Sequence, residues 1–213
     1  MQSPSIKRLL SSLKKLPSVG QRTAERFIYH WLKTGKGEVN ELRGALNELL
    51  ANTKSCETCW DFGDVNPCPI CRDPKRDRSR ICVVAEPQDL QAIESTGAFV
   101  GVYHVLRGVL QADDEDSLKK IKIKELLNRV SLPFIRGELG GGKGLTEIIL
   151  ALNPDLAGEI TMMYLEKKIK AAAPGLKVSR LAKGLPMGGD LQYADDITLS
   201  SAIKNRTTKS PPL

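Results

Sequence analysis

The sequence lacks any long hydrophobic run, and no stretch approaches the ~20 apolar residues that a membrane-spanning helix needs. Aromatic residues make up only 5% of the 213 residues, and histidine occurs twice. Neither His30 nor His104 has a nucleophilic side chain near it in the sequence, so we expect both to serve in packing. The chain also lacks a secretory signal with an apolar core, which argues against a disulfide-stabilised secreted protein.

Acidic residues are absent from positions 1–24, which are rich in Ser, Lys and Arg, as an organellar transit peptide is. This stretch runs without a break into a motif that needs its first helix, so we expect it to belong to the folded protein. Most of the net charge of +7 lies in residues 1–55, which carry ten Lys or Arg against four Glu. Such a concentration favours a polyanionic partner, nucleic acid first, although a solvated lysine-rich surface has the same composition.

Four of the five cysteines form two Cys-x-x-Cys pairs, Cys56 with Cys59 and Cys68 with Cys71. Four thiolates at this spacing can surround one zinc ion tetrahedrally, and the polar spacer between the pairs is typical of turns. Two disulfides are the alternative, but they need an oxidising compartment. The sequence therefore predicts one structural zinc ion per chain, in a closed site that catalyses nothing. The fifth cysteine, Cys82, lies in an apolar run and is expected to be an inert core thiol.

Apolar periodicity predicts three helices in the first 52 residues, followed after the cysteines by alternating strands and helices. Strands are predicted at 81–85, 102–106, 147–152 and 177–182, and helices at 87–96, 119–130, 158–173 and 194–205. This alternation indicates a mainly parallel sheet covered by helices. A glycine-rich loop at 137–144 resembles a phosphate-binding loop, but a strand follows it where a helix is required, so we do not expect it to bind ATP.

A short turn at 16–20 (Leu-Pro-Ser-Val-Gly) joins the first two predicted helices. The free N–H groups and the dipole at the start of the second helix favour a phosphate without reading any base. Arg22 and Arg26 lie one turn apart on that helix, and Lys14 and Lys15 end the preceding one. The pattern resembles a helix-hairpin-helix whose usual first glycine is replaced by Ser18. A plain helical hairpin with surface arginines is the alternative.

Two acids, Asp155 and Glu159, lie where a predicted strand gives way to a helix. Acids at the carboxyl ends of parallel strands are where such sheets place their sites, and Mg²⁺ chemistry needs several of them together. The alternative is structural, with Asp155 capping the helix and Glu159 in its first turn.

Taken together, the chain resembles the bacterial recombination-repair protein family RecR over nearly its whole length. The resemblance rests on an ordered set of segments: 16–20, the four cysteines, 81–84 (Ile-Cys-Val-Val), 89–94 (Asp-Leu-Gln-Ala-Ile-Glu), 101–106 (Gly-Val-Tyr-His-Val-Leu), 158–161 (Gly-Glu-Ile-Thr), 184–189 (Gly-Leu-Pro-Met-Gly-Gly) and 198–199 (Thr-Leu).

The resemblance implies a multi-domain α/β protein. A basic helix-hairpin-helix segment for DNA binding and oligomerisation is expected at 1–55, a four-cysteine zinc finger at 56–79, a Toprim-like domain at 80–176 and a C-terminal segment with a strand and a helix at 177–213. The family's DNA-contacting lysine and arginine would fall on Arg22 and Arg26. Dimers or ring-like tetramers that surround DNA are implied, as is action with RecO, and in some settings RecF, to load RecA on gapped DNA in the bacterial cytoplasm.

Some positions depart from the family pattern. Ala85 and Ala157 replace glutamates that the family usually has, and Glu86, one residue later in an extended chain, would point to the opposite face. These changes place any Toprim metal site in doubt and leave Asp155 and Glu159 as residual acids, with partner docking as their expected role.

We therefore expect a non-enzymatic DNA-binding mediator of recombinational repair. A Mg²⁺-dependent Toprim nuclease or topoisomerase and a protein-interaction scaffold with incidental DNA affinity are the alternatives.

Overall fold

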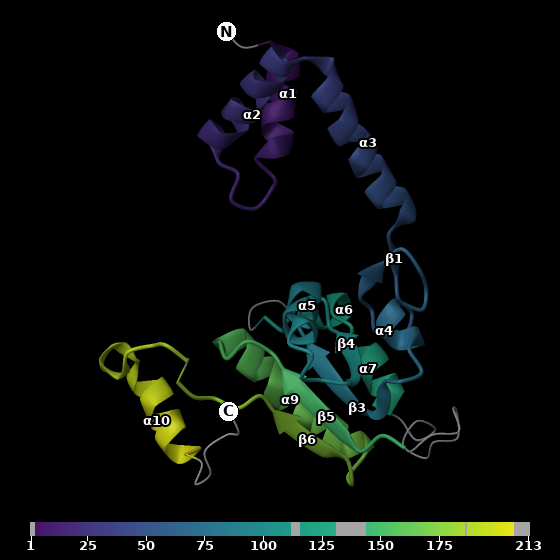
Figure 1. The fold of residues 1–213 in the computed structure, drawn as a ribbon, viewed down its shortest axis with the longest axis vertical. Coiled ribbons are helices and arrows are strands. Elements are labelled where there is room, and N and C mark those ends of the chain that lie inside the picture. The colour runs from purple at the N-terminus through teal and green to yellow at the C-terminus, as the bar shows by residue number, and fades with distance from the viewer. Residues whose placement is uncertain (1–2, 112–115, 131–143, 186, 207–213) are drawn as a thin grey trace. The chain divides into compact units, whose positions relative to one another are not determined.

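The computed structural model describes residues 3–111, 116–130, 144–185 and 187–206 (Figure 1). The chain divides into two compact units, Met1–Thr53 and Lys54–Leu213. Apart from Gly144, the glycine-rich loop lies outside the described residues. None of the described helices is long and apolar enough to cross a membrane.

The first unit contains three helices, as predicted: α1 (Pro4–Leu13), α2 (Gln21–Thr34) and α3 (Lys36–Asn52). The hydroxyl of Ser3 caps α1 by accepting a hydrogen bond from a first-turn N–H group. The core of this unit is small, because among residues 3–53 it buries only Leu10, Ala24 and Ile28. Helix α3 buries no residue at all among its seventeen.

The second unit begins with the cysteine segment, which contains β1 (Lys54–Ser55), β2 (Phe62–Gly63) and the short helix α4 (Pro69–Arg72). Strands β1 and β2 pair antiparallel, and the rest of the spacer between the cysteine pairs forms turns and bends. The segment is therefore two tight loops braced by very little regular structure.

The larger part of the second unit is a parallel sheet with the strand order β4-β3-β5-β6. Its strands are β3 (Asp77–Val84), β4 (Gly101–Val105), β5 (Glu147–Ala151) and β6 (Lys177–Arg180). All three pairings within it are parallel, as the alternation of strands and helices predicts. Strand β3 starts four residues before the apolar run at 81–85. Its first half is polar and not fully buried, so apolar pattern alone does not reveal it.

Helices cover both faces of this sheet (Figure 1). Side chains alternate across a strand, so Ile81 and Val83 belong to one core cluster and Cys82 and Val84 to the other. The first cluster lies under α7 (Ile123–Val130) and α9 (Leu156–Ala172), and the second lies under α5 (Pro87–Ser95). Burial raises the pKa of the Cys82 thiol to about 12, which agrees with an inert core thiol.

The single helix predicted at 119–130 is wrong. The chain forms two helices there, α6 (Ser117–Lys120) and α7, separated by Ile121 in an extended conformation. Ile121 is buried in the core, and the next residue, Lys122, donates its N–H to the Leu106 carbonyl. Tertiary contacts at these two positions therefore override local helix propensity.

After the sheet, the described chain forms a 3₁₀ turn, η1 (Leu191–Tyr193), and a final helix, α10 (Asp196–Lys204). The side chain of Asp195 caps α10 by accepting the Thr198 N–H at 2.8 Å. No residue of α10 is buried, so this predicted helix, like α3, exposes its apolar side chains.

Candidate metal centre and nucleic-acid interface

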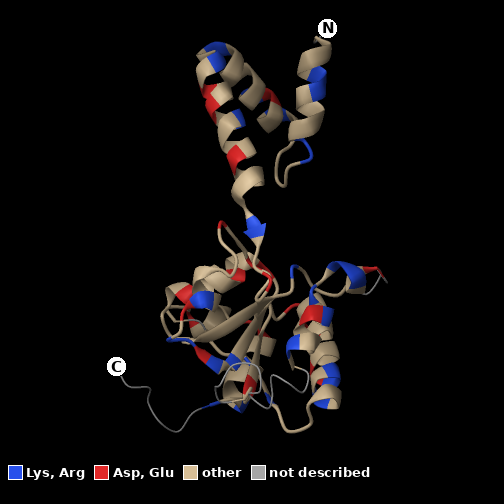
Figure 2. Ribbon diagram, turned by 90° about the vertical axis from the view of Figure 1, so that its right-hand side faces the viewer, with Lys and Arg blue, Asp and Glu red and all other residues tan. Residues whose placement is uncertain are grey.

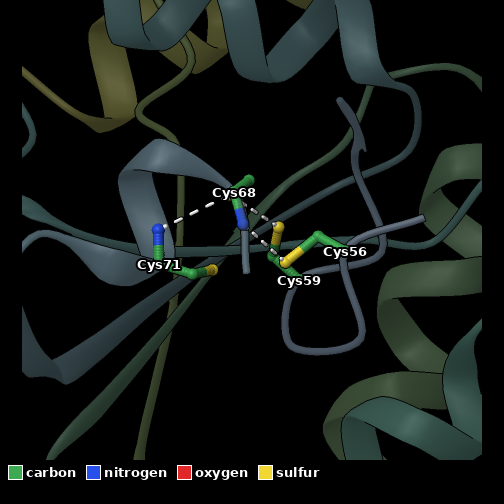
Figure 3. A group of neighbouring side chains, drawn as sticks. All are labelled: Cys56, Cys59, Cys68 and Cys71. Atoms are coloured by element: carbon green, nitrogen blue, oxygen red, sulfur yellow. Dashed lines mark hydrogen bonds between the residues drawn. The ribbon is translucent and has the colours of Figure 1, made fainter. Parts of the chain in front are cut away.

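The two Cys-x-x-Cys loops bring their four sulfur atoms together (Figure 3). All four Sγ atoms lie within 4.8 Å of one another, and all four residues are buried. Sulfurs bound at about 2.3 Å to one tetrahedral zinc ion are about 3.8 Å apart. The Sγ atoms of Cys59 and Cys68 are separated by 3.6 Å, so the geometry suits a shared metal ion. All five cysteines are free thiols rather than disulfides.

The charge on this cluster also favours a cation. Hydrogen bonds from the neighbouring thiols lower the pKa of Cys68, whereas the hydrogen bond with Cys68 raises the pKa of Cys59. One buried thiolate thus makes the next one costly, and a divalent cation removes that cost by binding the deprotonated sulfurs. Two backbone N–H groups already point at sulfur, Cys68 N to Cys56 Sγ at 3.4 Å and Cys71 N to Cys68 Sγ at 3.5 Å. Within the described residues this is the one group of three or more potential ligands that could hold a metal ion.

Local sequence explains both loops. In the first, Trp60 adopts the left-handed conformation (φ 66°), and its N–H donates to the Cys56 carbonyl at 2.8 Å. In the second, Cys68 is the N-cap of α4 and Pro69 is its first residue, a position that proline favours. Both loops are therefore tight turns, and together they bring the four sulfurs within 4.8 Å of one another.

The cysteine segment is fastened to the sheet of the same unit by contacts that the sequence did not signal. The N–H of Val105 in β4 donates to the Cys59 carbonyl at 2.7 Å. The guanidinium of Arg107 lies 3.9 Å from the ring centroid of Phe62, and the ammonium of Lys122 lies 4.3 Å from that of Trp60. The sequence places Arg107 just after a predicted strand and Lys122 in a predicted helix, so only the folded contacts reveal their role.

The hairpin between α1 and α2 keeps its turn despite the serine in place of glycine. Ser18 adopts the left-handed conformation (φ 61°), which glycine takes freely and which costs other residues about 1–2 kcal/mol. The following helix α2 starts at the N-cap Gly20 without any side-chain cap. Its first N–H groups therefore remain available to a ligand oxygen.

The four predicted DNA-binding cations are all exposed in the first unit: Lys14, Lys15, Arg22 and Arg26. Arg22 and Arg26 share one face of α2, because residues four apart are neighbours on a helix. Figure 2 shows Lys and Arg in blue on α1, on α2 and in the loop between them. No ion pair involves any of these four side chains among the residues that the structure describes.

The two acids at the start of α9 serve structural contacts. Asp155 is the N-cap and accepts the Gly158 N–H at 2.7 Å. Glu159 accepts hydrogen bonds from Arg180, at 2.7 Å, and from Lys183, and these cations hold the pKa of its carboxyl below the usual value, Lys183 contributing most. Asp155 thus caps the helix and Glu159 lies in its first turn, as the structural alternative to a Mg²⁺ site describes.

Ala85 and Glu86, which follow strand β3, supply no carboxylate that is free to bind a metal ion. Ala85 is buried in the core, and Glu86 forms a capping box with Asp89 at the start of α5. His104 is fully buried, as expected, but His30 lies on the surface, where its Nε2 atom is 3.0 Å from a Glu38 carboxyl oxygen.

A four-cysteine cluster that could hold a metal ion, a basic helical hairpin and a helix-covered parallel sheet together define a multi-domain protein of the Toprim class. Family models agree: a Toprim domain matches residues 79–182, a RecR helix-hairpin-helix matches 6–50 and a RecR C-terminal segment matches 184–207.

Curated relatives extend this likeness to almost the whole chain. The recombination protein RecR of Anaeromyxobacter dehalogenans is 44% identical over 94% of this chain and 96% of its own length. The proteins of the same name from Gloeobacter violaceus and Moorella thermoacetica are each 42% identical, over 97% and 94% of this chain and 98% and 95% of their own lengths. The chain belongs to the RecR family of recombination proteins. RecR proteins are recombination mediators rather than enzymes, and their Toprim domain is not catalytic.

Proposed function

We propose that the protein binds the phosphate backbone of DNA through the hairpin of its first unit, as a mediator of recombinational repair. The observation that carries the proposal is a set of exposed cations around an uncapped helix start, which form no ion pair within the described part of the chain, in a segment that matches the RecR helix-hairpin-helix model. Recognition depends on DNA structure more than on sequence, since nothing in the hairpin reads bases.

One hairpin offers only a few phosphate contacts, so the proposal includes assembly of several copies. A dimer or a ring-like tetramer multiplies weak contacts by raising their effective concentration. Support comes from α3, whose apolar residues recur at helical spacing yet are exposed in the unit: Val39, Leu42, Leu46 and Leu49. RecO and, in some settings, RecF would then join this assembly to load RecA on gapped DNA, in the bacterial cytoplasm with the nucleoid.

The metal in this proposal is one structural zinc ion per chain, held by Cys56, Cys59, Cys68 and Cys71. Four thiolates complete a tetrahedral shell and leave no position for a substrate. The ion supplies folding energy to a segment with hardly any core of its own. The protomer is then organised as a DNA-binding segment at 1–55, a zinc finger at 56–79, a Toprim-like domain at 80–176 and a C-terminal segment at 177–213.

Asp155 and Glu159 enter the proposal as a docking point for a protein partner rather than as Mg²⁺ ligands. Both lie at the carboxyl edge of the sheet, Asp155 is exposed and Glu159 is partly so. A nuclease would need several free carboxylates converging on the metal, whereas these two are committed to a helix cap and to two cations.

Fluorescence anisotropy of labelled gapped DNA, measured over a salt series, tests the hairpin. The R22A/R26A double variant should bind more weakly, with a salt slope smaller by about 0.9 for each lost duplex phosphate contact. The matched control is K167A/K170A, which removes the same charge from exposed positions of α9.

Equal losses in both double variants would show that overall charge, not the hairpin, drives binding. Unchanged binding by R22A/R26A at matched salt contradicts the proposal. A native protein that ignores DNA at low salt would favour the interaction-scaffold alternative.

A further inference from the structure

Arg129, in the last turn of α7, belongs to the sheet domain but lies beside the cysteine cluster. It lines a small cavity of about 70 Å³ together with Cys71 of the metal centre. The remaining lining residues are Thr58, Arg78, Ile81, Val102 and Leu145. A charged side chain at such a place needs a partner, because burying an unpaired charge is expensive.

The hydrogen bonds of Arg129 supply no negative charge. Its Nη1 atom donates to the Tyr103 carbonyl at 2.8 Å and contacts His104 Nδ1 at 3.2 Å. The opposite ring nitrogen of His104 is 2.8 Å from the Lys122 carbonyl, which can only accept. The imidazole therefore carries its proton on Nε2 and accepts from Arg129 through Nδ1, so the ring is neutral.

The negative charges that act on Arg129 belong to the cysteine sulfurs. Burial lowers the pKa of Arg129, and the cysteine thiolates, Cys71 first, act in the opposite direction. Among the residues that the structure describes, no carboxylate forms an ion pair with Arg129. A divalent ion bound to four thiolates keeps a net charge of about −2, which in turn needs cations around it.

We propose that Arg129, which is partly buried, is the counter-cation of the metal–tetrathiolate centre, so that metal loading of the cysteine segment and the placement of α7 on the sheet stabilise each other. The inference rests on the proposed zinc site and adds a positioning residue from outside the finger. Arg78 has a lesser part, because it is exposed and its guanidinium donates to the Cys71 carbonyl, at 2.9 Å, rather than to sulfur.

A purely structural arginine makes a different prediction from a counter-cation. If Arg129 only holds the Tyr103 carbonyl, its loss weakens the metal-free and the loaded protein equally. If it balances the thiolates, R129M weakens the loaded protein and leaves the metal-free protein about as stable as the parent, because a partly buried charge without a counter-charge has gone.

The test measures zinc affinity by competition with a chromophoric chelator at fixed pH, and thermal unfolding with and without zinc, in the full-length chain. R129M should lose affinity by about tenfold or more, the range seen when groups around a metal shell are removed. R129K keeps the charge and should retain most of the affinity. R129Q, which keeps hydrogen-bond donors without the charge, replaces R129M if the latter does not fold.

The matched control is R80M, which removes a partly buried arginine of β3 that is already paired with Asp77 at 2.7 Å. It should leave zinc affinity unchanged. Equal affinities for parent, R129M and R129Q overturn the inference while the zinc site survives, and so does equal destabilisation of both metal states. A parent protein that binds no zinc overturns the zinc site and the inference together.

Discussion

The two units of this chain differ in how much apolar surface they bury. In the second unit, strands β3 and β4 carry almost wholly buried segments, and two helix layers enclose them. In the first unit, three helices share three buried residues, and α3 contributes none of them. The second unit therefore has a core of its own, whereas the first unit leaves many apolar side chains exposed, Leu42, Leu46 and Leu49 of α3 among them.

Charge follows the same division. Several cations of the second unit are paired within it, as Arg76 is with Glu94 and Arg180 with Glu159 and Glu166. The hairpin cations of the first unit have no such partner among the described residues. Paired charges stabilise a domain, while unpaired ones keep their field available for an outside polyanion.

Among the tests of this contrast between the two units, we expect the largest effect from a variant that destroys the predicted metal site. Cys59→Ser should abolish stoichiometric zinc binding and unfold the cysteine segment, since structural zinc contributes on the order of 10 kcal/mol to such segments. Metal analysis and hydrogen exchange measure both effects. Cys82→Ala is the control, because it removes a buried thiol outside the cluster. Retention of zinc by Cys59→Ser would contradict the four-ligand site.

Truncating one leucine in each unit tests whether the cores really differ. Leu165→Ala, at a fully buried position of α9, should lower the free energy of unfolding by about 2–5 kcal/mol. Leu46→Ala, whose side chain is half exposed on α3, should change it by only about 0.5 kcal/mol in dilute, monomeric protein. Chemical denaturation measures both. A similar loss for the two variants would break the comparison.

The pH dependence of the second unit provides a third test. Burial lowers the pKa of His104 to about 3, so between about pH 6.5 and 3 the unfolded chain holds a proton that the folded chain does not. Stability from this residue is complete above about pH 6.5 and is lost as the pH falls, by about 1 kcal/mol near pH 5.5.

His104→Gln can still accept from Arg129 and donate to the Lys122 carbonyl, so its unfolding free energy should change less over this range. Both proteins are compared free of metal, because acid also releases zinc. Parallel pH profiles would show that His104 is protonated without cost in the folded state.

The smallest expected effect is at the start of α9. Asp155→Ala removes a helix cap and should cost about 1 kcal/mol, while Asp155→Asn, which can still accept the Gly158 N–H, should cost less. Thermal unfolding compares the two. If the asparagine variant were as unstable as the alanine variant, the carboxylate charge rather than the cap would be what matters.

The sequence predicted what depends on short-range pattern. The apolar run at 81–84 indicated a strand buried on both faces, and the cysteine spacing indicated the sulfur cluster. The break at Ile121 escaped prediction, because a core contact and a long-range hydrogen bond cause it. Arg129 escaped for a similar reason: only the folded chain brings it from a helix surface to Cys71.

The hydrogen bond from Val105 to the Cys59 carbonyl has one more consequence. Strand β4 is at the border of the sheet, where unsatisfied main-chain groups would invite a foreign strand to add on. The cysteine loop accepts a hydrogen bond from one of those groups, the Val105 N–H, and so hinders the pairing of another strand with this edge. If the cysteine cluster binds a metal ion, its removal should release the loop and expose the edge of β4, so that aggregation precedes simple unfolding.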